Sequence, residues 1–141
     1  MLEINRLSKN FNDRAILNDL NLKLTSNTIY KLQGPNGVGK TTLLKIIKGI
    51  YSQNIGEIKF CDESDFECSV SYVDSNTRSF IHRLSVKENL RYFAALNKIK
   101  YEDFQLKSLF DNFDSNGLYD KSFSDLSLGQ MQLVSLIRGL M

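Results

Sequence analysis

The stretch "GPNGVGKTT", residues 34–42, decides how the rest of the chain is interpreted. It fits the pattern G-x-x-x-x-G-K-[ST], in which the backbone N–H groups of a glycine-rich loop surround a phosphate. Gly34, Gly37 and Gly39 permit backbone conformations that a Cβ would obstruct. A helix that begins at the end of this loop would direct the positive end of its dipole at the same anion. The stretch therefore predicts a nucleotide-phosphate site.

The polar side chains of the loop fit the same chemistry. The Lys40 ammonium can reach the β- and γ-phosphates, the Thr41 hydroxyl can ligate Mg²⁺, and Thr42 can contact the α-phosphate. A glycine-rich turn with a chance lysine is disfavoured, because a strand-like segment precedes the loop and an apolar helix follows it. The predicted nucleotide-binding residues are Gly34, Pro35, Asn36, Gly37, Val38, Gly39, Lys40, Thr41 and Thr42.

The hydrophobic pattern around the loop alternates between strand and helix periods. An α/β fold with a parallel core, an antiparallel flank and a small helical part would produce this order of elements. Ser85 and Glu88 form a capping-box pattern at the start of one of the helices. Strands are predicted at 2–11, 15–25, 28–34, 52–60 and 67–73, and helices at 41–50, 85–97, 104–113 and from Ser127 onward.

Composition narrows the possible partners. The chain has 141 residues, which is one domain at most or part of a larger one. Its net charge of +2 is too small to indicate a nucleic-acid partner. No apolar run reaches the 18 or so residues that span a bilayer, and the N-terminus has no secretory h-region. Cys61 and Cys68, with the single His82 elsewhere, suit no common metal site and are expected to be free thiols.

A second motif, "LSLGQ" at 126–130, opens the last predicted helix. Ser127 can cap that helix, and Gln130 stands three residues later at the capping-box position. Gly129 leaves the helix start without a side chain, so its N–H groups could receive an anion. Taken alone, the motif is better explained as an ordinary capped helix.

"GPNGVGKTT" followed by "LSLGQ" resembles the ATP-binding cassette family, the nucleotide-binding subunits of ABC transporters. In that family the loop is the Walker A motif and LSGGQ is the signature motif. The resemblance covers the whole chain, including "ILNDLNLKL" before the loop and "GEIKF" after its helix. "SFIHRLSVKENLRYFAALN" is most similar to exporter-type, ABC-2-like members.

The resemblance implies an α/β fold, a P-loop NTPase (ABC ATPase) core with an antiparallel β subdomain and a small α-helical subdomain. Residues 1–60 would form the β subdomain with Walker A, 76–126 the helical subdomain and 127–141 the signature helix. Residues 1–141 would be the N-terminal portion of the domain, with the C-terminal part of the core missing.

The same resemblance implies that ATP and Mg²⁺ are the cofactors, with Thr41 as the Mg²⁺ ligand. Phe11 occupies the place of the aromatic residue that stacks on adenine, although a buried strand residue would also account for it. Two cassettes would pair, so that Ser127, Leu128, Gly129 and Gln130 act in trans on the partner's ATP. Transmembrane subunits would be the other partners, and the chain would lie on the cytoplasmic face of a membrane and drive export.

Three departures from the family pattern bear on activity. Leu128 replaces the first glycine of the signature, and Ser75 stands where the Q-loop glutamine is expected. No apolar run followed by Asp-Glu is present, so the Walker B carboxylates are absent. The nearest imitation, "IKFCDE" at 58–63, reads as an edge strand with a charged turn. No catalytic residue is therefore predicted, and the chain alone is expected to be inactive.

Other nucleotide-binding classes fit less well. A GTPase would need N-K-x-D, and "NKIK" at 97–100 lacks the aspartate. "DSNG" at 114–117 imitates the GTPase D-x-x-G, but no apolar strand precedes it. A nucleoside kinase would not account for "LSLGQ", and non-transport cassettes usually carry two cassettes or long insertions. The alternative that stays open is a degenerate or partial cassette that binds ATP or a partner subunit without hydrolysis.

Overall fold

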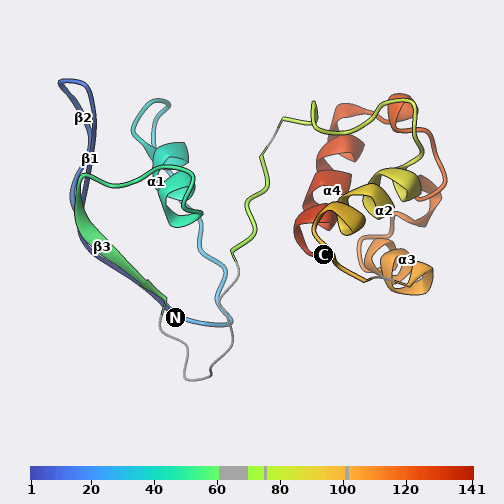
Figure 1. The fold of residues 1–141 in the computed structure, drawn as a ribbon, viewed down its shortest axis with the longest axis horizontal. Helices are drawn as coiled ribbons and strands as arrows, with labels where there is room; N and C mark the ends of the chain where they lie inside the picture. The colour runs from blue at the N-terminus through green and yellow to red at the C-terminus, as the bar shows by residue number, and fades with distance from the viewer. Residues whose placement is uncertain (61–69, 75, 101) are drawn as a thin grey trace. The chain divides into compact units, whose positions relative to one another are not determined.

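The computed structural model describes residues 1–60, 70–74, 76–100 and 102–141. The chain divides into two compact units, Met1–Tyr72 and Val73–Met141 (Figure 1). Several predicted features fall outside the described residues: Cys61 and Cys68, the acidic end of "IKFCDE", Ser75, and residues 67–69 of the strand expected at 67–73.

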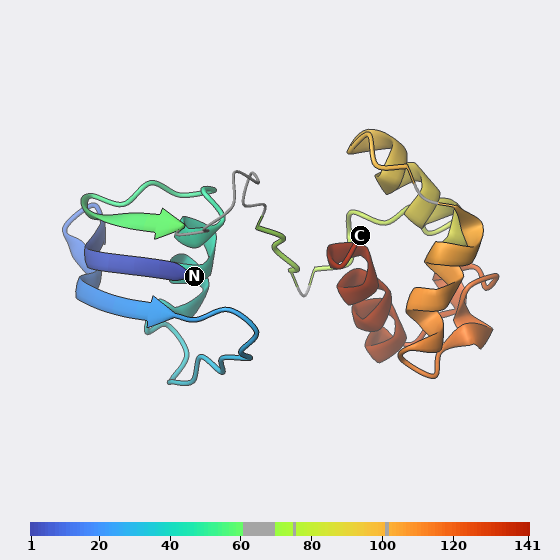
Figure 2. The same ribbon diagram turned by 90° about the horizontal axis from the view of Figure 1, so that it is seen from below.

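The first unit is a three-stranded antiparallel sheet with one helix on one face (Figure 2). The strand order is β2-β1-β3. An irregularity in β1 between Ile4 and Leu7, where Arg6 has a φ of 50°, lets both side chains pack with Leu43 and Ile46 of the helix. These four side chains are almost fully buried and form the core of the unit. The elements are β1 (Leu2–Phe11), β2 (Arg14–Leu24), α1 (Lys40–Ile47) and β3 (Ile55–Phe60).

The strand predicted at 28–34 is not formed, and that prediction is wrong. A strand requires a neighbour that shares its backbone hydrogen bonds, and the ladders of the described residues join only β1, β2 and β3. Ile29 is fully exposed. Thr25 instead donates its backbone N–H to the Tyr30 hydroxyl at 2.9 Å, and hydrogen bonds with Thr25 lower the pKa of Tyr30. Residues 70–73 of the strand expected at 67–73 are also not a strand.

The second unit is helical, as the sequence predicts. Its helices enclose a core that includes Phe80, Val86, Leu90, Phe110 and Phe123. The rings of Phe80 and Phe123 are stacked, with their centroids 4.4 Å apart. The elements are α2 (Val86–Leu96), α3 (Asp103–Asp111), η1 (Asn116–Leu118), η2 (Phe123–Asp125) and α4 (Leu128–Gly139). Among the described residues, no helix combines the length and apolar character that crossing a bilayer requires.

The capping box predicted for α2 is confirmed. The Glu88 carboxylate accepts from the Ser85 backbone N–H at 2.7 Å, and the Ser85 hydroxyl accepts from the Glu88 N–H at 3.2 Å. These bonds satisfy two donors at the helix start. The pKa of the Glu88 carboxyl is lowered by a hydrogen bond from the Ser85 hydroxyl at 2.7 Å and by the one from the Ser85 backbone N–H. The structure therefore begins α2 one residue after Ser85.

Asn89 links α2 to the segment that precedes it. Its side chain is fully buried, accepts from the Ile81 N–H at 2.8 Å and donates to the Ile81 carbonyl at 2.9 Å. A second donor contact reaches the Ser85 carbonyl at 3.0 Å. A single amide thus satisfies both backbone groups of one residue in a segment without regular structure.

We expect Asn89→Leu to lower the free energy of unfolding by about 1–3 kcal/mol, because the Ile81 N–H loses its acceptor. The Ile81 carbonyl keeps a hydrogen bond from the Leu84 N–H at 3.1 Å. Urea denaturation followed by far-ultraviolet circular dichroism measures this change. Asn112→Leu, at an exposed position just after α3, is the matched control and should stay within about 0.5 kcal/mol of the original chain. Equal stabilities for the two variants would contradict the assigned role of Asn89.

Candidate nucleotide site

The predicted phosphate loop ends at the start of α1, as an anion site requires. Lys40 is the first residue of the helix and Gly39 is its N-cap, with φ 103° and no side-chain hydrogen bond to the cap. Gly37 also has a positive φ, 82°. The first N–H groups of α1 are consequently left for a ligand, and the helix dipole favours a negative one.

Gly39 lies so close to β2 that a side chain there would crowd its neighbours. A Cβ at this position would lie 3.0 Å from the Cγ2 of Ile16 and 3.1 Å from the Ile16 carbonyl oxygen. Since φ is also in the left-handed region, a larger residue would meet both backbone strain and a clash. The start of α1 is thereby fixed against the β1–β2 hairpin.

A cavity of about 230 Å³ opens at this junction. It is lined by six of the nine predicted nucleotide-binding residues, which include Lys40 and the two threonines that follow it. Ile16 of β2 supplies the apolar wall, and no sequence motif marks it as a site residue. The full set of lining residues is Ile16, Asn36, Gly37, Gly39, Lys40, Thr41 and Thr42.

The Lys40 side chain folds back over its own loop. Its ammonium donates to the carbonyl oxygens of Gly34 and Pro35, each at 2.8 Å. These bonds hold a positive charge beside the uncapped helix start, where a phosphate group would meet both. The predicted role of Lys40 stays a prediction, but its position suits it.

Phe11, the predicted adenine contact, lies at the end of β1 opposite Arg14. Its side chain is 40% exposed, so it is not the buried strand residue that was the competing interpretation. Ile16 follows Arg14 by two residues on the same strand and lines the phosphate cavity. The hairpin therefore carries a candidate base contact and a wall of the phosphate site.

The signature residues lie in the second unit, at the start of α4. The capping box is confirmed: the Gln130 N–H donates to the Ser127 hydroxyl at 3.3 Å, and the Gln130 amide oxygen accepts from the Ser127 N–H at 3.0 Å. Leu128 is 64% exposed, and a Cβ at Gly129 would meet open space. Ser127 keeps its hydroxyl proton to donate to a further acceptor.

Comparison with known proteins shows the family. The family model described as ABC transporter matches residues 17–141, so the chain belongs to the ABC transporter ATP-binding cassettes. This confirms the P-loop NTPase fold predicted from the two motifs. The direction of transport is not settled by membership, because the family contains both import and export proteins.

Three relatives illustrate the match. The chain is 32% identical to the spermidine/putrescine import ATP-binding protein PotA of Spiroplasma citri, over 99% of this chain and 42% of that protein. It is 34% identical to the cytochrome c biogenesis ATP-binding export protein CcmA of Reclinomonas americana, over 92% of this chain and 60% of that one. The structure of cbiO1 from Clostridium perfringens, part of the ABC transporter complex cbiONQ, aligns with TM-score 0.80 at 23% identity.

The chain spans about two fifths of the length of PotA, and 60% of the cbiO1 chain, of which it shares the fold. The activities and substrates in the names of these relatives therefore belong to longer chains than this one.

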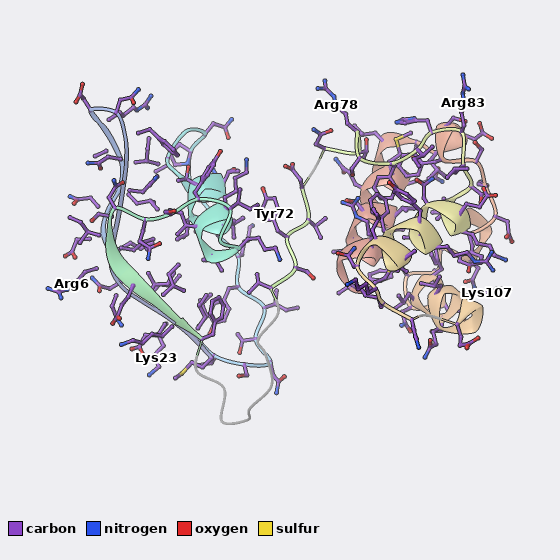
Figure 3. All side chains as sticks on the ribbon, in the orientation of Figure 1. Arg6, Lys23, Tyr72, Arg78, Arg83 and Lys107 are labelled. Atoms are coloured by element: carbon purple, nitrogen blue, oxygen red, sulfur yellow. The ribbon has the colours of Figure 1, made fainter. Side chains whose placement is uncertain are left out.

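We expect Lys40→Ala to weaken Mg-ATP binding at least about tenfold, because a charge-assisted hydrogen bond contributes about 1.5–3 kcal/mol. Titration of the purified chain by isothermal calorimetry or NMR measures the affinity. Lys23→Ala removes the same charge from the face of the sheet turned away from α1 and is the matched control (Figure 3). An ATP affinity unchanged in a folded Lys40→Ala chain would refute the phosphate-loop assignment.

Proposed function

We propose that the chain is the ATP-binding part of an ABC transporter's nucleotide-binding subunit. The observation that carries this proposal is the start of α1, where no side chain caps the first N–H groups. Gly37 and Gly39, both with positive φ, form the loop that leads into the helix, and the Lys40 ammonium is hydrogen-bonded to that loop. In the proposed complex the loop residues 34–42 surround the phosphates, and the ring of Phe11 stacks on the adenine.

One residue of the loop, Thr41, is proposed to bind Mg²⁺. Thr41 lines the phosphate cavity beside the helix start, and a threonine hydroxyl is a suitable oxygen ligand for this hard cation. Mg²⁺ in such sites takes its remaining oxygens from the nucleotide phosphates and water, and from carboxylates where the protein offers them. Bound Mg²⁺ would neutralise phosphate charge, while Lys40 and the N–H groups of α1 orient the phosphates.

The signature residues are proposed to act on a second cassette. Ser127 and Gly129 are exposed at the start of α4, where helix N–H groups and a hydroxyl could meet the γ-phosphate of a partner's ATP. Pairing with a second nucleotide-binding domain and docking to transmembrane subunits, on the cytoplasmic face of a membrane, follow from the family. Leu128, in place of a glycine, leaves both of these residues accessible.

Export is the proposed direction of transport. Its support is the resemblance of "SFIHRLSVKENLRYFAALN" to exporter-type members and the relative named for cytochrome c biogenesis export. Other relatives, named for polyamine, zinc, sulfate and galactose transport, are import proteins. Substrate accumulation in inside-out vesicles that contain the assembled transporter separates the two directions. Accumulation inside such vesicles indicates export from the cell, and loss from them indicates import.

Hydrolysis is proposed to require a carboxylate that this chain does not supply. Phosphoryl transfer needs a group that orients the attacking water, and the sequence contains no apolar run followed by Asp-Glu. The second candidate function, a partial cassette that binds ATP or a partner without hydrolysis, is favoured by that same observation. Both candidates share the phosphate loop and differ in turnover.

We expect the purified 141-residue chain to bind Mg-ATP and to release phosphate no faster than a buffer blank. Adding a polypeptide that carries the acidic half of a cassette should restore turnover, because it supplies the missing carboxylate. Steady-state phosphate release, with Lys40→Ala as the background control, measures this. Robust, Lys40-dependent release by the chain alone would show that a catalytic carboxylate has been overlooked.

A further expectation concerns Ser127. Ser127→Arg should abolish ATP-dependent dimerisation and any restored hydrolysis, while ATP binding by one chain should change less than about twofold, because the serine acts on the partner's nucleotide. Light scattering with and without Mg-ATP measures the dimer. Ser108→Arg, which places the same side chain on exposed α3, is the control and should leave the dimer intact. Equal loss of dimer in both variants would contradict the role in trans.

A further inference from the structure

Tyr51 lies against Phe11, although the two residues are 40 positions apart in the sequence. The two ring centroids are 5.5 Å apart and the ring planes meet at 79°, an edge-to-face arrangement that attracts aromatic rings. Both side chains are partly exposed, Phe11 at 40% and Tyr51 at 37%. Two aromatic rings therefore meet at the surface instead of in the core of the unit.

Backbone hydrogen bonds hold Tyr51 in this place. Asn54 donates its N–H to the Ser8 carbonyl at 2.9 Å, and its side-chain oxygen accepts from the Asn10 N–H at 2.8 Å. At the other end of the connection, the N–H of Ile50 donates to the Lys45 carbonyl at 2.8 Å. The connection from α1 to β3 is thus fastened to both β1 and α1, on either side of Tyr51.

Each ring also carries a lysine ammonium. Lys9 places its Nζ 4.9 Å from the centroid of Phe11, and Lys45 places its Nζ 5.4 Å from the centroid of Tyr51. Cations over aromatic faces are attracted by the ring quadrupole. Two aromatic rings with two ammonium groups suit a ligand that is both aromatic and anionic, as a nucleotide is.

The pair is connected to the phosphate site through the hairpin. Phe11 pairs with Arg14, and Ile16, two residues further along β2, lines the phosphate cavity. A change in the orientation of Phe11 would therefore alter where a base lies relative to the phosphates. This makes the contact with Tyr51 relevant to base recognition and not only to packing.

We infer that Tyr51 is a positioning residue, which holds the ring of Phe11 in the orientation that receives the nucleotide base. This inference rests on the proposed function, in which Phe11 contacts adenine and the loop at 34–42 holds the phosphates. Without the ring at position 51, Phe11 keeps its chemistry but gains rotational freedom, and ordering it then opposes binding of the base.

The test compares ATP with inorganic tripolyphosphate, which has phosphates and no base, as ligands of the full chain in the presence of Mg²⁺. NMR titration gives both dissociation constants even when they are millimolar. Tyr51→Ala should weaken ATP about three- to tenfold and leave tripolyphosphate unchanged, because an edge-to-face ring pair contributes on this scale. Tyr51→Phe retains the ring and should restore ATP affinity. In a Phe11→Ala chain, Tyr51→Ala should have no further effect.

Tyr92→Ala is the matched control, since Tyr92 is 44% exposed and its ring meets Phe93 edge to face at 5.5 Å in the other unit. Unchanged ATP affinity in Tyr51→Ala would overturn the inference. Equal loss of ATP and tripolyphosphate, or a loss that Tyr51→Phe does not restore, would also overturn it. If the original chain binds neither ligand in a Lys40-dependent way, the proposed function itself fails. If it does so and Tyr51→Ala has no effect, only the role of Tyr51 fails.

Discussion

The close approach of Gly39 to β2 is the constraint on which the candidate nucleotide site depends. A Cβ at this position would lie 3.0–3.1 Å from atoms of Ile16, which is closer than an ordinary van der Waals contact. The absence of a side chain lets the start of α1 lie directly against the β1–β2 hairpin. Because the hairpin also carries Phe11 at its end, one contact fixes the phosphate cradle relative to the candidate base contact.

The electrostatics of the site follow from this arrangement. The first turn of α1 presents N–H groups that no side chain caps, and Lys40 is held beside them by the carbonyl oxygens of Gly34 and Pro35. A bound triphosphate would exchange two neutral acceptors of the ammonium for charged ones, which makes stronger hydrogen bonds. The N–H donors and the ammonium group therefore already lie where an anion would bind.

The local part of the structure could be predicted from the sequence. Alternation located β1, β2 and β3, and the capping boxes at Ser85 and Ser127 located the starts of α2 and α4, because each box depends only on residues three apart. The loop motif likewise predicted that a helix begins where the glycine-rich loop ends, and α1 does begin there. These features rest on contacts between near neighbours in the chain.

Features that depend on distant partners were missed. Residues 28–34 have the composition of a strand, but strand formation needs a hydrogen-bonded neighbour, and the described ladders contain none for them. Ile16 and Tyr51 reach the site through the pairing of β1 with β2 and through Asn54, which periodicity does not reveal. Likewise, the sequence shows Asn89 only as a polar residue in a predicted helix, and its hydrogen bonds to Ile81 could not be predicted from it.

The central claim is that one unit, Met1–Tyr72, contains both ends of a nucleotide site. Amide chemical-shift changes on addition of Mg-ATP, measured by NMR on the full chain, test this claim most directly. The account predicts the largest changes at Gly37, Gly39, Lys40 and Thr41, with a second group at Phe11 and Tyr51 that tripolyphosphate does not produce. Changes confined to other residues, or an identical pattern with ATP and tripolyphosphate, would contradict it.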